Sequence, residues 1–202
     1  MQVENQLPIM EHFYTVQGEG AHSGTAAYFV RLAGCDVGCH WCDVKESWEI
    51  QKDQYQTINS LLEAINKHAS KTVVITGGEP TTYDLNSFTA SLKEEDFQIH
   101  IETSGVYQIK GQIDWITLSP KKFKPCLPEN FKKADELKVV VFHPSDLKWA
   151  EELAQNVRKD CKLYLQPEWG KRETIAPLII EYIQSNPKWK ISIQSHKYLN
   201  IP

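Results

Sequence analysis

The chain has 202 residues, of which 41% are hydrophobic and 24% charged, and its formal net charge at pH 7 is −4. These values are typical of one ordinary globular domain, and we expect residues 1–202 to form a single domain. No apolar run approaches the ~20 residues that cross a bilayer, and the net negative charge gives no reason to expect a nucleic-acid surface, so neither a membrane nor a nucleic acid is an expected partner.

Strand-like and helix-like patterns alternate along the chain. In chain order the patterns predict a strand at 26–33, a helix at 58–65, a strand at 72–76, a helix at 85–92, strands at 97–102, 113–118 and 137–142, a helix at 146–157, a strand at 163–165, a helix at 175–183 and a strand at 190–193. The first helix rests on Ile58, Leu61, Leu62 and Ile65, which recur at i, i+3, i+4 and i+7.

This alternation predicts an α/β fold with a mainly parallel sheet. Right-handed crossovers curl such a sheet, and about six strands make a partial, open βα barrel. Functional loops of βα barrels follow the carboxyl ends of the strands. Polar and glycine-rich segments fall at those positions, beginning at residues 35, 76, 102, 119 and 166.

Three cysteines follow the first predicted strand with the spacing C-x3-C-x2-C, at Cys35, Cys39 and Cys42. Three thiolates on one loop can hold three irons of a [4Fe-4S] cubane and leave the fourth iron open to a small molecule. A zinc site with His40 or His22 as fourth ligand is the main alternative, and the spacing favours the cluster over zinc. An odd number of clustered cysteines argues against a disulfide.

The cellular compartment is predicted from the N-terminus and the other cysteines. Met1 to Asn5 lack the basic and apolar regions of a signal peptide, which predicts a cytoplasmic protein. The isolated Cys126 and Cys161 are then expected to be plain thiols.

Other polar segments each allow a structural and a functional interpretation. Residues 76–80 (Thr-Gly-Gly-Glu-Pro) suit either a tight turn after a strand or a binding loop for an amino-acid-like group. Residues 17–20 (Gln-Gly-Glu-Gly) on their own favour a hairpin turn. Arg31, inside an apolar strand, requires an anionic partner, which is either an internal carboxylate or a substrate.

Taken together, these segments resemble the 7-carboxy-7-deazaguanine synthase family of radical S-adenosylmethionine (SAM) enzymes. The resemblance spans essentially the whole chain, through residues 13–20, 35–48, 76–80, 101–105, 119–121, 136–140, 166–167 and 196–202. It implies one radical SAM domain that converts 6-carboxy-5,6,7,8-tetrahydropterin to 7-carboxy-7-deazaguanine with loss of ammonia, in queuosine biosynthesis. In that family a deoxyadenosyl radical takes hydrogen from C6, the ring contracts, and SAM is regenerated.

The resemblance also implies the site residues and partners. Cys35, Cys39 and Cys42 would hold the cluster, and the pterin would contact Val16, Gln17, Gly18, Glu19, Arg31, Thr76, His196 and the Pro202 carboxylate. SAM would contact Trp41, Cys42, Asp43, Gly78, Glu79, Ser119, Pro120, Lys121, Gln166, Pro167, Glu168 and Trp169. A flavodoxin or ferredoxin would be the reductant, and a homodimer is expected.

One position departs from the family pattern. Val44 stands where the family carries a Thr or Ser whose hydroxyl binds Mg²⁺, and a valine side chain offers no oxygen ligand. We therefore expect weaker Mg²⁺ dependence than usual. Two alternative functions stay open at this point: a glycyl-radical-enzyme activase, which would share the cysteine loop, and a zinc-stabilised binding module.

Overall fold

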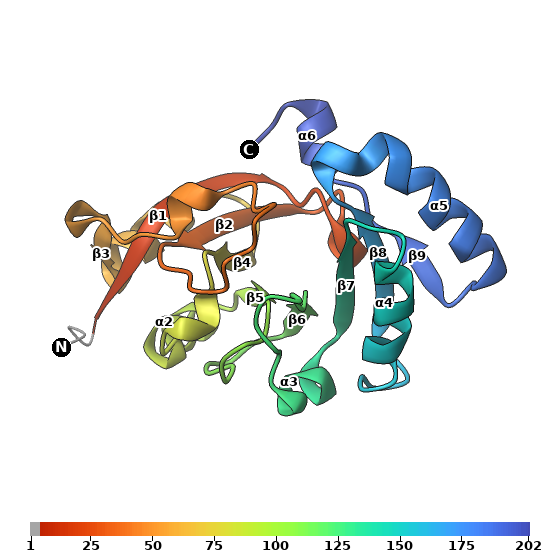
Figure 1. The fold of residues 1–202 in the computed structure, drawn as a ribbon. Helices are drawn as coiled ribbons and strands as arrows, with labels where there is room; N and C mark the ends of the chain where they lie inside the picture. Colours follow the sequence, from red (N-terminus) through yellow and green to blue (C-terminus); the bar gives the residue numbers. More distant parts are fainter. Residues whose placement is uncertain (1–4) are drawn as a thin grey trace.

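The computed structural model describes residues 5–202 (Figure 1). The prediction about a signal peptide rests on residues that, apart from Asn5, lie outside this range. Nine strands form one sheet: β1 (Gln6–Val16), β2 (Ala26–Leu32), β3 (Tyr55–Thr57), β4 (Thr72–Gly77), β5 (Gln98–Thr103), β6 (Trp115–Leu118), β7 (Glu136–Val141), β8 (Lys162–Pro167) and β9 (Trp189–Ile191). The helices are α1 (Ile58–Ile65), α2 (Asn86–Glu94), α3 (Pro128–Lys133), α4 (Asp146–Ala154), α5 (Arg172–Ser185) and α6 (Ser195–Leu199).

The sheet is the open, mainly parallel one that the sequence predicts. Its order is β3-β1-β2-β4-β5-β6-β7-β8-β9, with parallel pairing from β2 through β9 and antiparallel pairing of β1 to both β2 and β3. Figure 1 shows the strands as a curved arc that does not close, with α2, α3, α4 and α5 on its outer side. The α/β, partial-barrel prediction is confirmed, with β1 and β3 added to it.

The two faces of the sheet differ sharply in polarity because side chains alternate along each strand. Leu137, Val139 and Val141 of β7 pack outward into an apolar cluster with α3, α4 and α5, while Glu136 and Lys138 lie on the opposite face. The same alternation runs along the neighbouring strands: a second outer cluster joins β1, β2, β4 and β5 to α1 and α2. The helix-covered face therefore supplies the core, and the concave face is free to carry polar groups.

The sequence patterns did not predict four of these elements, β1, β3, α3 and α6. Pro8 interrupts the pattern of β1; it lies at the end of the β1–β2 ladder, whose first pair is Ile9 with Leu32. Elements β3, α3 and α6 span three to six residues, too short to show a period. Across the described range, no helix is both long and apolar enough to cross a membrane.

Candidate active site

A cavity of about 370 Å³ lies on the concave face, at the carboxyl ends of the parallel strands. Its lining comes from the segments that follow β1, β2, β4, β5, β6 and β8, and from the chain after β9. This is the end of a βα barrel that carries the functional loops. The size, with mostly apolar walls and a few polar groups, is typical of a small-molecule site.

The cysteine loop (residues 34–43) follows β2 and forms one wall of the cavity. Gly34, with φ +94°, turns the chain, and its N–H donates to the carbonyl of Ser47 at 2.7 Å. The N–H of Cys42 donates to the carbonyl of Cys39 at 3.0 Å, which tightens the loop. Cys35, Cys39 and Cys42 are all free thiols and all line the cavity.

The surroundings of these thiols are apolar. Val37 and Val106 are buried beside them, and Trp41 and Tyr107 pack against the same cluster. Burial raises the pKa of the Cys39 thiol to about 11. Iron–sulfur clusters bind cysteines as thiolates, so cluster binding here would have to deprotonate Cys39, and the apolar shell would limit solvent access to the cluster.

These residues fit a cubane cluster better than a single metal ion. Each thiolate of a cubane binds a different iron, so the three sulfurs need not converge on one point. Among residues 5–202, no group of three or more His, Cys, Asp or Glu side chains is arranged to hold one metal ion. The zinc alternative therefore has no support from the geometry of the described side chains.

The glycine turn after β4 (residues 77–79) packs directly on the start of the cysteine loop. The N–H of Gly78 donates to the carbonyl of Leu32, and the N–H of Glu79 to that of Gly34, both at 2.9 Å. A Cβ on Gly78 would lie 2.3 Å from the Gly34 oxygen, and one on Gly77 2.3 Å from the Leu32 oxygen. Only glycine permits this approach, so the turn and the cysteine loop form one unit.

The Glu79 carboxylate lies inside the protein and is saturated with hydrogen bonds. Its Oε1 accepts from the Thr81 N–H at 3.0 Å, the Thr81 hydroxyl at 2.6 Å and the Thr103 hydroxyl. Its Oε2 accepts from the Ser104 N–H at 2.9 Å and from the Ser104 hydroxyl. Five donors use essentially all the lone-pair sites of a carboxylate. The side chain therefore joins the ends of β4 and β5, although the residue also lines the cavity.

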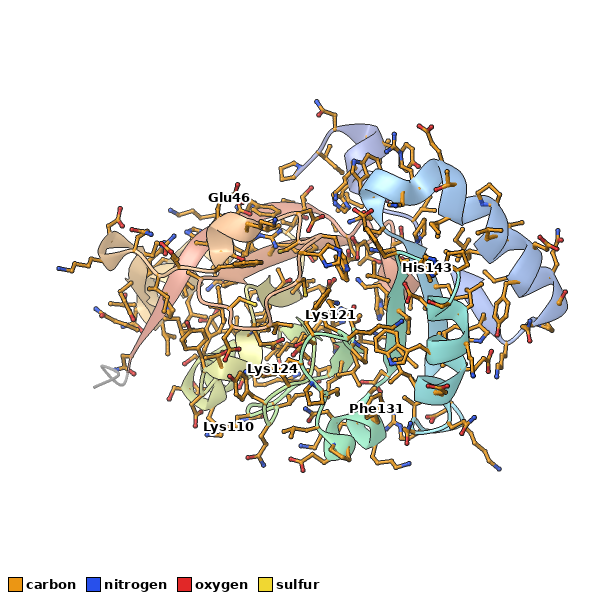
Figure 2. The ribbon with its side chains drawn as sticks, viewed as in Figure 1. Glu46, Lys110, Lys121, Lys124, Phe131 and His143 are labelled. Atoms are coloured by element: carbon orange, nitrogen blue, oxygen red, sulfur yellow. The ribbon has the colours of Figure 1, made fainter. Side chains whose placement is uncertain are left out.

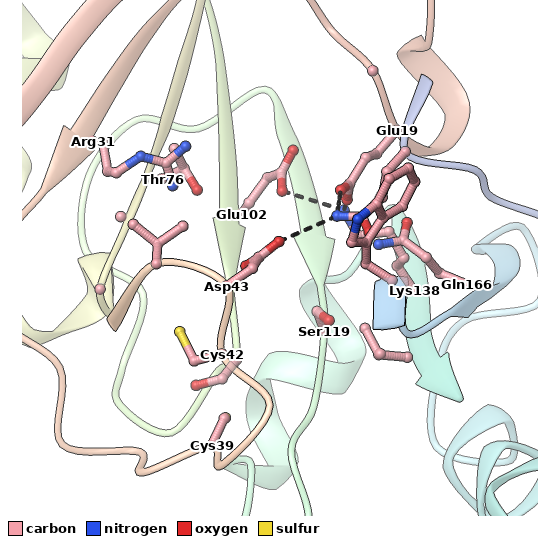
Figure 3. A pocket seen from close by; sticks show the side chains of 18 of the residues that line it. Glu19, Arg31, Cys39, Cys42, Asp43, Thr76, Glu102, Ser119, Lys138 and Gln166 are labelled. Carbon is pink, nitrogen blue, oxygen red and sulfur yellow. Dashed lines mark hydrogen bonds and ion pairs between the residues drawn. The ribbon is translucent and has the colours of Figure 1, made fainter. Parts of the chain in front are cut away.

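A buried lysine joins two acidic residues on the opposite wall (Figure 3). Lys138 forms ion pairs with Glu19 and, at 3.2 Å, with Glu102. The Gln17 amide donates to the other oxygen of Glu102 at 2.8 Å. Burial by itself raises the pKa of Glu19, but Lys138 and Gln194 outweigh it and lower the pKa to about 2. Glu19 is thus held ionised at the cavity wall.

Residues 17–20, which we call the 17–20 turn, both close a hairpin and line the cavity. The N–H of Gln17 donates to the Thr25 carbonyl at 2.8 Å, which joins β1 to β2 as the hairpin interpretation predicts. Gln17, Gly18 and Glu19 also line the cavity. The two interpretations of this segment are therefore compatible.

Arg31 lines the cavity and has an internal partner. Its Nε donates to Glu11 of the neighbouring strand β1 at 2.6 Å. Among the contacts of residues 5–202 this pair uses Nε alone, and the two terminal nitrogens make no hydrogen bond. Thr76 lies beside Arg31 in the β2–β4 register and lines the same wall.

The C-terminal segment (residues 192–202) closes the cavity from above the 17–20 turn. The N–H and hydroxyl of Ser195 both donate to the Gly18 carbonyl, at 2.9 and 3.0 Å. Lys197 forms an ion pair with Asp43 of the cysteine loop. His196 packs against Gly18, where a Cβ would lie 2.3 Å from its Nδ1. Helix α6 has no buried residue, so polar contacts hold it in place.

The loops after β6 and β8 complete the lining. Lys121 donates to the Ser119 carbonyl at 2.7 Å and hydroxyl at 2.6 Å, and its ammonium lies 5.6 Å from the centre of the Trp41 ring. Figure 2 shows Lys121 near the middle of the open side, with Lys124 and Lys110 farther out. The Gln166 amide oxygen accepts from Ser192 at 2.7 Å.

All but one of the predicted site residues line this cavity, including Val16, Val44, Pro167, Glu168, Trp169 and Pro202; Pro120 does not. The lining also includes side chains outside the predicted set: Phe13, Phe29, Val37, Trp48, Glu102, Thr103, Ser104, Lys138, Val140, Gln194 and Lys197. Lys138 could have been identified from the sequence, since a lysine inside an otherwise apolar strand requires a charged partner. Gln194 and Lys197 could not have been identified in this way, because their hydrogen-bond partners are distant in sequence.

Comparison with known proteins gives a consistent result. The model of the radical SAM superfamily matches residues 30–143. A 7-carboxy-7-deazaguanine synthase from Flavobacterium psychrophilum is 53% identical over 97% of this chain and 93% of that protein, and one from Synechocystis sp. is 44% identical over 96% and 93%. The crystal structure of QueE from Escherichia coli matches with a TM-score of 0.82 at 33% identity, over 94% of both chains. These similarities do not favour an activase or a zinc module.

Proposed function

The chain belongs to the 7-carboxy-7-deazaguanine synthase family of radical SAM enzymes, and on that premise we propose its reaction. The enzyme converts 6-carboxy-5,6,7,8-tetrahydropterin to 7-carboxy-7-deazaguanine with loss of ammonia. The observation that carries this function is one shared cavity. The cysteine loop, the 17–20 turn and the C-terminal segment all line it, although nearly the whole chain separates the last two.

The cluster and SAM are implied by the family, and Cys35, Cys39 and Cys42 would hold the cluster. When bound, the two groups supply a 5′-deoxyadenosyl radical that takes hydrogen from C6 of the pterin. The apolar residues around the cysteines exclude water from this region, which protects a radical from side reactions.

The SAM contacts are proposed along the wall formed by the cysteine loop and the loops after β4, β6 and β8. Gly78 brings bare backbone to the cavity; its N–H already donates to Leu32, so its carbonyl is the group that suits the amino group of the methionine part. Glu79 is assigned an indirect role, since its carboxylate already accepts five hydrogen bonds: it fixes the turn that presents Gly78. Trp41 and Trp169 offer flat apolar surface for the adenosyl part.

The pterin is proposed to bind between the 17–20 turn and the C-terminal segment. Arg31 would bind the substrate carboxylate through its two terminal nitrogens. Glu19, held ionised by Lys138, would accept from a pterin N–H group. The Pro202 carboxylate would accept the paired N–H donors of the pyrimidinone edge.

We propose that this enzyme depends on Mg²⁺ less than is usual in the family. Val44 lines the cavity and offers no oxygen to a cation that requires oxygen ligands. Activity titrated against Mg²⁺ in chelator-treated buffer tests this proposal. A steep, saturable requirement would contradict it.

A flavodoxin or ferredoxin is proposed to dock over the cysteine loop. Phe123 is exposed and contacts His40, the residue after Cys39, with ring centroids 5.2 Å apart. Lys122 and Lys124 flank Phe123; their side chains are partly exposed and also form ion pairs with Asp146 and Asp36. Basic groups around an apolar centre suit a small acidic carrier. K122E should slow reduction by flavodoxin severalfold and leave reduction by dithionite unchanged; equal rates with flavodoxin would refute this docking face.

The single domain over residues 1–202 and the homodimer are proposed from the family resemblance. Light scattering after gel filtration tests the dimer, since a monomer mass at micromolar concentration would exclude a stable one.

The decisive test of the function is anaerobic incubation of the reconstituted enzyme with SAM, reductant and 6-carboxytetrahydropterin. We expect a brown protein and 7-carboxy-7-deazaguanine detected by mass. Removing Ile201 and Pro202 should abolish pterin turnover and preserve uncoupled SAM cleavage. A colourless protein, or turnover that survives this truncation, would contradict the cluster or the terminal contact, respectively.

A further inference from the structure

Two charged residues of β7 differ in how completely their charged groups are paired. Glu136 and Lys138 are two positions apart, so both face the concave side, and both are almost completely buried. Lys138 is balanced by Glu19 and Glu102. Glu136 lies deeper, near the amino end of the strand, and does not line the main cavity.

Glu136 uses only one of its oxygens. Its Oε2 accepts from the Ala21 N–H at 2.9 Å, at the start of the short 3-10 helix η1 (Gly20–His22). Its Oε1 is buried and has no hydrogen-bond partner in the part of the chain that the structure describes. A buried carboxylate oxygen without a donor is costly, by about 1–3 kcal/mol or more.

Two other buried polar atoms without partners lie close to it. They are Nε2 of His22 and Nε1 of Trp115, whose rings are in edge contact with centroids 4.5 Å apart. His22, Trp115 and Glu136 all line one small cavity, separate from the main one, of about 10 Å³. That is the space that a single water occupies.

The chemistry of the three atoms selects water over other small ligands. The indole N–H of Trp115 only donates, and the Glu136 carboxylate in its ionised form only accepts. A water can accept from the first and donate to the second and to His22, which satisfies all three. An ammonium ion has no lone pair for Trp115, and a metal ion would face the indole N–H.

The position of this cavity connects it with the substrate. Gln17, Glu19, Glu102 and Lys138 line both cavities and so form the wall between them. Glu136 also presses on the 17–20 turn from behind: a Cβ on Gly20, which has φ +64°, would lie 2.1 Å from its Oε1. The proposed pterin-binding turn is thus supported by Glu136 at its far end.

We propose that this small cavity holds one ordered water bound by Glu136, Trp115 and His22, and that Glu136 with this water is a positioning group for the pterin. It acts through the backbone of the 17–20 turn, which it holds at the substrate. The role in positioning rests on the proposed function. The water site does not.

The first test is a crystal structure of the reconstituted enzyme at a resolution that shows ordered waters. We expect one water within hydrogen-bond distance of the Glu136 carboxylate, the Trp115 indole nitrogen and His22 Nε2. An empty cavity, or a side chain that fills it, would overturn the proposal. This readout holds whatever reaction the enzyme catalyses.

The second test separates positioning from stability. E136A should raise the KM for 6-carboxytetrahydropterin about tenfold, the equivalent of one lost hydrogen bond. E136Q should restore KM to within threefold, because its amide oxygen still accepts from Ala21. Uncoupled SAM cleavage and iron content should not change in either variant. A KM for E136A within twofold of the parent would refute the positioning role.

E151Q is the matched control. Glu151 accepts from Tyr182 and Trp189, both at 2.6 Å, in the outer layer and away from both cavities. E151Q should lower thermal stability and leave KM unchanged; an equal rise in KM would show that E136A acts through stability alone.

If E136A does not fold, the W115F variant tests the positioning role instead. It should remove the water and raise KM about threefold, and an unchanged KM without the water would refute the positioning role.

Discussion

Replacing Glu79 by Gln tests the central support of the site, because it changes one oxygen to an NH₂ group at nearly constant volume. The amide that E79Q introduces can adopt two orientations, and the one that costs less free energy places its NH₂ group toward Ser104. The Ser104 hydroxyl can then rotate to accept, but the Ser104 N–H loses its acceptor. One orphaned buried N–H costs about 1–3 kcal/mol, and the three bonds that remain to Oε1 lose their charge-assisted strength.

We therefore expect E79Q to destabilise the folded enzyme by about 3 kcal/mol, a fall in Tm of roughly 6–12 °C for a chain of this length. Anaerobic urea denaturation and thermal melts of the cluster-loaded protein measure it. S104A, which removes one hydroxyl donor, should cost only about 1 kcal/mol, and E129Q on the exposed surface less than about 0.5 kcal/mol. If Glu79 instead binds SAM through its side chain, E79Q would keep the parent stability and lose SAM affinity. That result would refute the reasoning.

Three further outcomes follow from the buried charges and from Val44. K138M leaves Glu19 and Glu102 without their cation and should destabilise the fold by about 3–5 kcal/mol, measured by urea denaturation; a loss below 1 kcal/mol would contradict the buried ion pairs. Burial lowers the pKa of His100 to about 4, so between pH 6.5 and 4 the unfolded chain binds the extra proton and stability falls as pH falls. From pH 8 to pH 5 the His100 contribution costs about 2 kcal/mol in the parent, and H100Q should lose that part of the dependence; burial also lowers the pKa of His22 and of His196, so their parts remain, and equal pH profiles for parent and H100Q would contradict the assignment. V44T should introduce a measurable Mg²⁺ dependence of pterin turnover, and no change on Mg²⁺ addition would show that position 44 does not bind the cation.

The accuracy of the sequence predictions depends on how local the determinants are. Helix α1 was predicted from four apolar residues at helical spacing that lie in one short stretch of the chain, and the structure places a helix over Ile58–Ile65. The Glu79 network was not predicted, because its donors Thr81, Thr103 and Ser104 come from two strand ends that only the fold brings together. The pair between Asp43 and Lys197 shows the same limit over 154 positions.

The prediction of the residues at the rim of the site also depended on combining several weak sequence signals. Residues 17–20 on their own favoured a turn, and Arg31 on its own fitted either an internal ion pair or a substrate anion; the structure contains the turn and an ion pair of Arg31 with Glu11. Only their place in a family pattern pointed to a shared ligand. The alternation of side chains along β7 gives a physical reason for the polar wall of the cavity. One face of the strand packs against the outer helices and is apolar, so Glu136 and Lys138 lie on the opposite, concave face.

The bond between Ser195 and Gly18 ties the last helix to the first hairpin, 177 positions earlier. A ribosome must therefore release nearly the entire polypeptide before this wall can assemble. A prematurely terminated product would retain the complete cysteine loop and yet lack the barrier beside it. Such a fragment would leave this side of the cavity facing solvent, because it would lack the contacts of Ser195 with Gly18 and of Lys197 with Asp43.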